Sequence, residues 1–117
     1  MEIYREFKFD AAHRLPCLPR DHRCGNLHGH TFAVIVHMEG SVGEDSGWVR
    51  DYGEVKSICA PVIDMLDHSY LNDISGLENP TSERIAVWLW ERIKPKLPEL
   101  TMIEVKETAS TGCRYSG

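Results

Sequence analysis

Long apolar runs are missing from this sequence, and positive charge is scarce. No segment has the roughly 20 consecutive apolar residues needed to cross a bilayer, and no charged-then-apolar leader opens the chain. The 13 Lys and Arg are outnumbered by 18 Asp and Glu, which gives a formal net charge of -5 at pH 7. Such a chain lacks the basic surface that nucleic acids and anionic membranes attract. We therefore expect a cytoplasmic protein with no membrane or nucleic-acid partner, which binds small molecules or further copies of itself.

Paired cysteine motifs and internal repeats are also absent. The four cysteines form no Cys-x-x-Cys motif, and a chain with 42% hydrophobic residues can fold without disulfides. We interpret all four as free thiols. No low-complexity tract or linker divides the chain, and 117 residues suffice for one two-layer core. The sequence predicts a single domain over residues 1–117.

Alternating apolar and polar residues predict two strands near the N-terminus, over residues 2–13 and 28–39. Apolar residues at helical spacing then predict one helix after residue 52. A second helix is expected to begin at Pro80, with Asn79 as its cap. These four elements leave a long loop between the first two strands.

Two more strands are expected over residues 102–108 and 113–115. The order ββααββ indicates an α+β fold, a four-stranded antiparallel sheet with both helices on one face. We also expect a short strand over residues 48–52, and a kink or a late helix start at Pro61. Such a sheet has two unpaired edges, which predicts oligomerisation.

Three histidines stand where the first two strands would bring them together. His28 and His30 project from one face, because residues i and i+2 of a strand do so. His13 ends the preceding strand on the face of its apolar residues. If the strands pair antiparallel with their apolar faces together, the three imidazoles converge. Neutral imidazoles suit zinc and leave a fourth position for water or substrate, whereas burying them unpaired would be costly.

Cys24 precedes this pair by four residues, and three interpretations stay open. It could be a fourth zinc ligand, a catalytic thiol beside an open site, or an unreactive loop cysteine. The chemistry favours the catalytic thiol over the ligand. Asp67 and His68 stand at the end of the first helix, where a carboxylate on one ring nitrogen would leave the other for proton transfer. Spacing alone favours the other interpretation, a helix-end histidine that contacts carbonyls.

Glu107 is a carboxylate in an apolar pattern. Period two places it on the side of Ile103 and Val105, where a lone carboxylate is costly unless it is paired. A ligand with two parallel N–H groups, such as the edge of a guanidine-like heterocycle, would pair with it. The alternative is that the strand has ended and Glu107 is exposed.

Five segments, in this order along the chain, resemble motifs of the family of pyruvoyltetrahydropterin and carboxytetrahydropterin synthases. The resemblance covers nearly the whole chain, and five motifs in order are far more specific than any one of them. The segments are Ala11-Ala12-His13-Arg14-Leu15, Cys24-Gly25-Asn26-Leu27-His28-Gly29-His30, Leu66-Asp67-His68, Asn79-Pro80-Thr81-Ser82-Glu83 and Lys106-Glu107-Thr108.

The resemblance implies the tunnelling fold and a role for each site residue. The implied assembly is a trimer whose sheets join into a barrel, with two trimers stacked as a homohexamer. The implied roles are zinc ligands for His13, His28 and His30, a proton-transferring thiol for Cys24, its partners for Asp67 and His68, a pterin anchor for Glu107, and contacts to the pterin from a neighbouring subunit for Thr81 and Ser82.

Three residues separate Cys24 from His28, which resembles the bacterial carboxytetrahydropterin branch of the queuosine pathway. The animal-type pyruvoyl branch has a longer spacer. The implied zinc-dependent reaction converts 7,8-dihydroneopterin triphosphate and water to 6-carboxy-5,6,7,8-tetrahydropterin, acetaldehyde and triphosphate. The alternatives are the pyruvoyl-forming reaction at the same site, a zinc hydrolase, and a non-catalytic zinc-binding module.

A triphosphate substrate needs local cations in a chain of negative net charge. Four arginines in or after the metal-site loops are available for it, and the sequence does not choose among them. They are Arg14, Arg20, Arg23 and Arg50.

Overall fold

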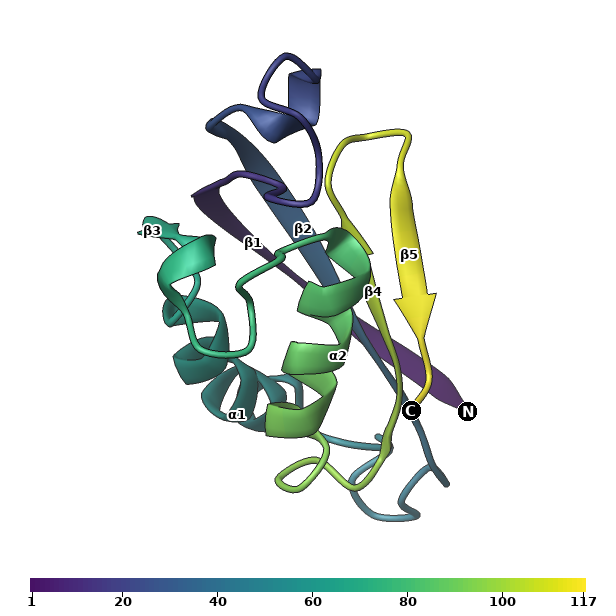
Figure 1. Ribbon diagram of the computed structural model, residues 1–117. Helices are drawn as coiled ribbons and strands as arrows, with labels where there is room; N and C mark the ends of the chain where they lie inside the picture. The colour runs from purple at the N-terminus through teal and green to yellow at the C-terminus, as the bar shows by residue number, and fades with distance from the viewer.

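The computed structural model describes all residues, 1–117, as a five-stranded sheet covered by two α-helices (Figure 1). The spatial order of the strands is β3-β1-β2-β4-β5. The elements are β1 (Glu2–His13), η1 (Arg23–Gly25), β2 (His28–Glu39), α1 (Tyr52–Asp64), β3 (Ser69–Tyr70), η2 (Leu71–Asp73), α2 (Ser82–Ile93), β4 (Leu100–Lys106) and β5 (Gly112–Tyr115).

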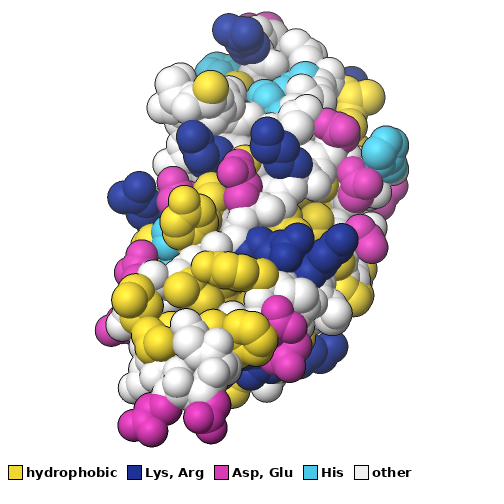
Figure 2. Space-filling model, turned by 180° about the vertical axis from the view of Figure 1, so that it is seen from behind, with side chains coloured by type: hydrophobic (Ala, Val, Ile, Leu, Met, Phe, Trp, Pro, Cys, Tyr) yellow, Lys and Arg dark blue, Asp and Glu magenta, His cyan; other side chains and the backbone are white.

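The antiparallel pair of β1 and β2 is the frame of the molecule. Both strands alternate buried and exposed residues, so one face of the pair is apolar and the other polar. On the apolar face Phe9 and Phe32 stack with ring centroids 4.9 Å apart. Figure 2 shows the molecule from the side away from the helices, where charged side chains of both signs are spread over the surface. The alternation of the sequence therefore corresponds to a real division between core and solvent.

Both helices lie on the apolar face of the sheet, as the sequence predicts (Figure 1). Twenty-two buried residues form one core cluster between the two layers. Helix α1 contributes Val55 and Cys59 to it, and α2 contributes Ile85, Leu89 and Ile93. None of the helices is both long and apolar enough to cross a membrane.

The predicted four-stranded, purely antiparallel sheet in the order ββααββ is wrong. A fifth strand, β3, lies between the two helices in sequence and pairs parallel with β1 at Ala11 and Ala12. Two residues are too short to show a strand period, so the sequence carries no signal for this strand. The sheet is mixed, and β3 holds the segment after α1 against the outer edge of β1, beside the histidines.

The expected strand over residues 48–52 is also wrong, and so is a late start of the first helix. Residues 48–50 form a bend, and Asp51 caps α1 by accepting a hydrogen bond from the Gly53 N–H at 3.1 Å. The helix then runs through Pro61 to its end at Asp64.

Helix α2 begins two residues later than predicted. Its cap is Thr81 rather than Asn79, because the Thr81 hydroxyl oxygen accepts a hydrogen bond from the Arg84 N–H at 3.3 Å. Ser82 is the first helical residue.

Candidate metal centre

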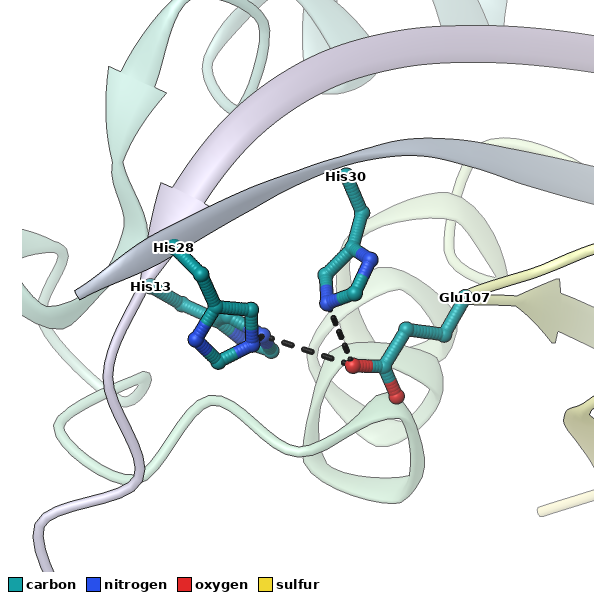
Figure 3. Close-up of side chains that lie close together, drawn as sticks. All are labelled: His13, His28, His30 and Glu107. Carbon is teal, nitrogen blue, oxygen red and sulfur yellow. Dashed lines mark hydrogen bonds and ion pairs between the residues drawn. The ribbon is translucent and has the colours of Figure 1, made fainter. Parts of the chain in front are cut away.

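The register of β1 and β2 brings three histidines together. His13 lies directly opposite His28, and Ala11 lies opposite His30, so all three imidazoles project from the same end of the apolar face. Figure 3 shows the three rings close to one another. The Nε2 atoms of His13 and His28 are 3.0 Å apart. Two ring nitrogens at this distance need either a proton or a cation between them.

The other ring nitrogen of two histidines is held by a backbone carbonyl. His13 Nδ1 lies 2.8 Å from the Pro80 carbonyl oxygen, and His28 Nδ1 lies 2.7 Å from the Asn26 carbonyl oxygen. A carbonyl can only accept, so both Nδ1 atoms carry the hydrogen and both Nε2 atoms are left with a lone pair. This is the arrangement that outer hydrogen bonds give to metal-binding histidines.

Glu107 completes the cluster. It follows β4, and its Oε1 lies 2.8 Å from His30 Nε2 and 3.4 Å from His13 Nε2 (Figure 3). Although the strand has ended, the Glu107 side chain is only 26% exposed. The sequence left two alternatives for Glu107, a paired carboxylate within the strand or an exposed one after it, and each was partly right. Glu107 follows the strand, but its carboxylate reaches the histidines instead of facing solvent.

The four side chains can hold a metal ion. One ligand atom from each of His13, His28, His30 and Glu107 lies within 4.8 Å of all the others. His30 Nε2 is buried and has no hydrogen bond of good geometry, although Glu107 Oε1 is close to it. A cation between these atoms would satisfy the lone pairs that the protein leaves without donors.

Burial keeps two of the histidines neutral. Desolvation lowers the pKa of His13 and of His30 below 6.5, and the Glu107 carboxylate only partly opposes this. His13 is fully buried, and its ring meets the Phe32 ring edge-on at 5.7 Å. Neutral imidazoles are the form that binds a metal, so the site is ready for one at neutral pH.

Cys24 lies in η1, close to the cluster in sequence but not a member of it. The group within 4.8 Å contains Glu107 in the place where a fourth ligand would stand, and Cys24 is not among its members. The Cys24 N–H donates to His22 Nδ1 at 3.1 Å, and its side chain is half-buried. The structure therefore does not support a closed site of three histidines and one cysteine.

Asp67 and His68 contact each other, although adjacent residues often point apart. Asp67 Oδ2 lies 2.9 Å from His68 Nδ1, and His68 has a positive φ of 55°, which is uncommon for a residue other than glycine. The hydrogen bond to Asp67, followed by its negative charge, raises the pKa of His68. The Asp10 N–H donates to Asp67 Oδ1 at 3.0 Å, and this bond, with the one from His68, lowers the pKa of Asp67.

This acid and imidazole pair lies on the other face of the sheet. Asp10 and Thr31 alternate with the buried residues of their strands, so their side chains point away from the histidine cluster. Asp10, Asp67 and His68 form a second group with ligand atoms within 4.8 Å of one another. Sequence reasoning missed Asp10, since nothing distinguishes it from the other polar residues of β1. No hydrogen bond joins this group to Cys24.

The residues that begin α2 lie beside His13. The Pro80 carbonyl that holds the His13 ring immediately precedes Thr81 and Ser82. The Ser82 hydroxyl donates to Glu83 Oε2 at 3.2 Å. Thr81 and Ser82 are far from the histidines in sequence, but they directly follow the carbonyl that contacts the His13 ring.

The fold and this cluster define an α+β protein with a candidate metal site of three histidines and one glutamate. The family model described as 6-pyruvoyl tetrahydropterin synthase matches residues 2–117. The chain belongs to this family, whose members are pterin-processing enzymes. Their substrates are small pterins.

Three similar proteins carry more specific names. The chain is 40% identical over 119 aligned residues to a 6-carboxy-5,6,7,8-tetrahydropterin synthase of Synechocystis, covering 97% of this chain and 91% of the relative. It is 42% identical over 96 residues to a dihydroneopterin monophosphate aldolase of Pyrococcus furiosus, covering 82% and 76%. The structure of a 6-pyruvoyl tetrahydropterin synthase of Caenorhabditis elegans superposes with a TM-score of 0.92 at 28% identity, covering 100% and 95%.

Proposed function

We propose that this chain is a zinc-dependent 6-carboxy-5,6,7,8-tetrahydropterin synthase. It would convert 7,8-dihydroneopterin triphosphate and water to the carboxylated pterin, acetaldehyde and triphosphate, as a cytoplasmic step of queuosine biosynthesis. The observation that carries the proposal is the 40% identity to the Synechocystis enzyme over nearly the whole chain. The three-residue spacing between Cys24 and His28 supports the same branch.

Zinc fits the donor set of the cluster. Three imidazole nitrogens and a fourth, exchangeable ligand are the arrangement of catalytic zinc sites. The buried His30 Nε2, which makes no hydrogen bond of good geometry, supports a cation there. His13, His28 and His30 would hold the ion. When bound, zinc would polarise the side-chain oxygens of the substrate and so acidify the neighbouring C–H bond.

Glu107 is proposed to bind the pterin ring. Its Oε1 faces the histidines, while its Oε2 makes no hydrogen bond within the chain and can accept from a ring N–H. The hydroxyls of Thr81 and Ser82 are proposed as further contacts to the ring. The Thr81 hydroxyl already accepts from the Arg84 N–H, but its own hydrogen is free to be donated.

Cys24, His68 and Asp67 are proposed to move protons. Cys24 would take the proton from the side-chain carbon of the substrate. His68 is held by Asp67, whose hydrogen bond and negative charge raise the pKa of the ring and so favour its protonated form. Since Asp67 and His68 lie on the face opposite the cluster, the pair would serve the site of a neighbouring copy. A homo-oligomer, proposed here as two stacked trimers, would bring the two halves together.

Two alternative reactions differ from the proposed one, either in the substrate or in how many side-chain carbons the product keeps. The Pyrococcus relative is named for the monophosphate of dihydroneopterin, and it supports an aldolase reaction on that substrate. The Caenorhabditis structure supports a pyruvoyl-forming reaction, which keeps all three side-chain carbons.

The product distinguishes these reactions. The zinc-loaded protein is incubated separately with dihydroneopterin triphosphate and with the monophosphate, and the pterin product is identified by mass. Acetaldehyde is followed through a coupled alcohol dehydrogenase. We expect carboxytetrahydropterin and acetaldehyde in equal amounts from the triphosphate, and about one zinc per chain by metal analysis.

Each alternative has its own signature. Triphosphate release without acetaldehyde would move the assignment to the pyruvoyl-forming reaction. Turnover of the monophosphate alone would move it to the aldolase. Zinc bound without turnover of either substrate would leave a non-catalytic zinc protein.

A further inference from the structure

The loop between β1 and β2 is an ordered structure. Its neck is closed by the Leu15 N–H, which donates to the Cys24 carbonyl at 3.0 Å, and by Arg14 Nε, which donates to the Gly25 carbonyl at 2.7 Å. Gly25 packs so tightly that an added Cβ would lie 2.0 Å from the Pro19 carbonyl oxygen. The backbone of this loop is therefore held next to the start of β2.

The loop is positively charged in an otherwise acidic chain. Residues 14–27 contain three arginines and one acidic residue, Asp21, which gives a local charge of +2 against -5 for the whole chain. A phosphorylated ligand would be attracted to this part of the surface rather than to the remainder.

Contacts within the chain exclude two of the four available arginines. Arg14 is half-buried and closes the loop neck. Arg50 lies 2.8 Å from a carboxylate oxygen of Glu54 and 3.2 Å from one of Glu99, so its charge is already neutralised. Both have structural roles.

Arg20 and Arg23 remain. Both side chains are exposed, and neither has a carboxylate oxygen within 4.0 Å. Arg23 immediately precedes Cys24. The short helix η1, to which Arg23 belongs, ends at Gly25, just before His28 begins β2. Of the four arginines in or after the metal-site loops, these two are free to receive an anion.

We propose that Arg20 and Arg23 bind the phosphate tail of the substrate, with Arg23 nearest the reacting carbons and Arg20 farther along the tail. Guanidinium groups bind phosphate oxygens through two parallel N–H donors, which suits a polyphosphate ester. The assignment rests on the proposed function for the identity of the substrate, but the binding site itself can be tested without turnover.

The test titrates inorganic triphosphate into the zinc-loaded protein by calorimetry at fixed ionic strength. Zinc content is measured before and after, so that removal of the metal by triphosphate is not counted as binding. We expect Arg23→Ala and Arg20→Ala each to raise the Kd about tenfold. Arg23→Lys should recover part of the loss. Lys96→Ala is the matched control, since this exposed cation has no ion pair and lies between α2 and β4, at the other end of the sheet.

Kd values for Arg20→Ala and Arg23→Ala equal to that of Lys96→Ala would overturn the assignment, and so would a wild-type protein that does not bind triphosphate. Steady-state kinetics separate this result from the reaction itself. If Arg23→Ala forms product with an unchanged KM, the proposed phosphate site is wrong, while the proposed reaction still holds. If triphosphate binding depends on the two arginines but the protein forms no product, the phosphate site holds and the proposed reaction is wrong.

Discussion

At the scale of single residues, the three histidines are held in two different ways. His13 and His28 each have an Nδ1 atom fixed by a carbonyl, whereas the only polar side chain close to a ring nitrogen of His30 is Glu107. The orientation of His30 therefore depends on a side chain that is also proposed to bind substrate. Glu107 would thus link the candidate metal site to the proposed pterin site.

Glu107→Gln should weaken pterin binding while zinc is retained. The amide places a donor or a neutral acceptor where the carboxylate met ring N–H groups, and losing a charge-assisted hydrogen bond costs about 1.5 to 3 kcal/mol. Three histidines are enough to hold zinc. Fluorescence titration with a non-reacting pterin and metal analysis measure the two properties. Loss of zinc with unchanged pterin affinity would make Glu107 a metal ligand instead.

Asp67→Asn should lower the pKa of His68. The wild-type carboxylate accepts a hydrogen bond from the ring and stabilises its charged form, so the folded-state pKa lies above the unfolded value of about 6.5. The interaction is complete below that value and is lost as the pH rises through the folded-state pKa. NMR titration of the imidazole measures the change, with His22 as an internal reference. An identical titration curve for His68 in both proteins would show that the contact does not exist in solution.

The sequence could predict the histidine cluster because period two alone places His13, His28 and His30 on one face. It could not place Glu107 or Asp10. Glu107 follows the end of β4, and its side chain reaches the histidines through the packing of β4 on β2, which no local pattern encodes. Asp10 gains its contact to Asp67 only because the segment after α1 returns to the edge of β1.

At the scale of elements, the two long strands were predictable and the shortest was not. Twelve residues in each of β1 and β2 alternate between apolar and polar, which is a strong strand signal. The observed bounds of both strands match the predicted ones. β3 has two residues and exists only because β1 offers an unpaired edge to it. Local patterns specify elements that bury a face of their own, whereas β3 depends on a neighbour that is distant in sequence.

The loop between β1 and β2 should be sensitive at Gly25. In Gly25→Ala the new Cβ would lie 2.0 Å from the Pro19 carbonyl oxygen, so the loop must shift, and we expect the free energy of unfolding to fall by about 1 to 3 kcal/mol. Zinc should be retained, because the histidines belong to the strands. Activity should fall, because Cys24 is displaced.

Urea denaturation, zinc content and turnover measure these effects, with Gly53→Ala as the control. A Cβ at Gly53 has no atom closer than the Asp51 carboxylate at 3.4 Å. Equal unfolding midpoints for the two variants would show that the loop relaxes without cost.

At the scale of the whole molecule, the candidate metal site and the Asp67–His68 pair lie on opposite faces of the sheet. The histidine cluster lies on the helix-covered face of the sheet, and Asp67 and His68 lie at the other face, beside Asp10. A single chain therefore separates groups that the reaction needs together.

Two inactive variants should restore each other's activity. Cys24→Ala and His68→Ala are unfolded and refolded together in equal amounts. If each site takes its thiol from one chain and its imidazole from the next, random assembly of a symmetric oligomer gives intact sites at about one quarter of the positions. Each variant refolded alone is the control, and the wild-type protein gives the yield of refolding. No turnover in the mixture, beside an active refolded wild type, would mean that the site is complete within one chain.

The register of β1 and β2 also decides where this chain can tolerate a change in length. One residue inserted within either strand would turn the histidines at its end to the opposite face, because neighbouring side chains alternate. The strand register does not restrict residues 14–27, and lengthening a surface loop away from the tightly packed Gly25 costs little. This loop holds Cys24 and the two free arginines, whereas the histidines lie outside it. Insertions and deletions in the loop can therefore move the thiol and the proposed phosphate-binding arginines while the histidines stay in place, so these two parts of the proposed site can diverge separately.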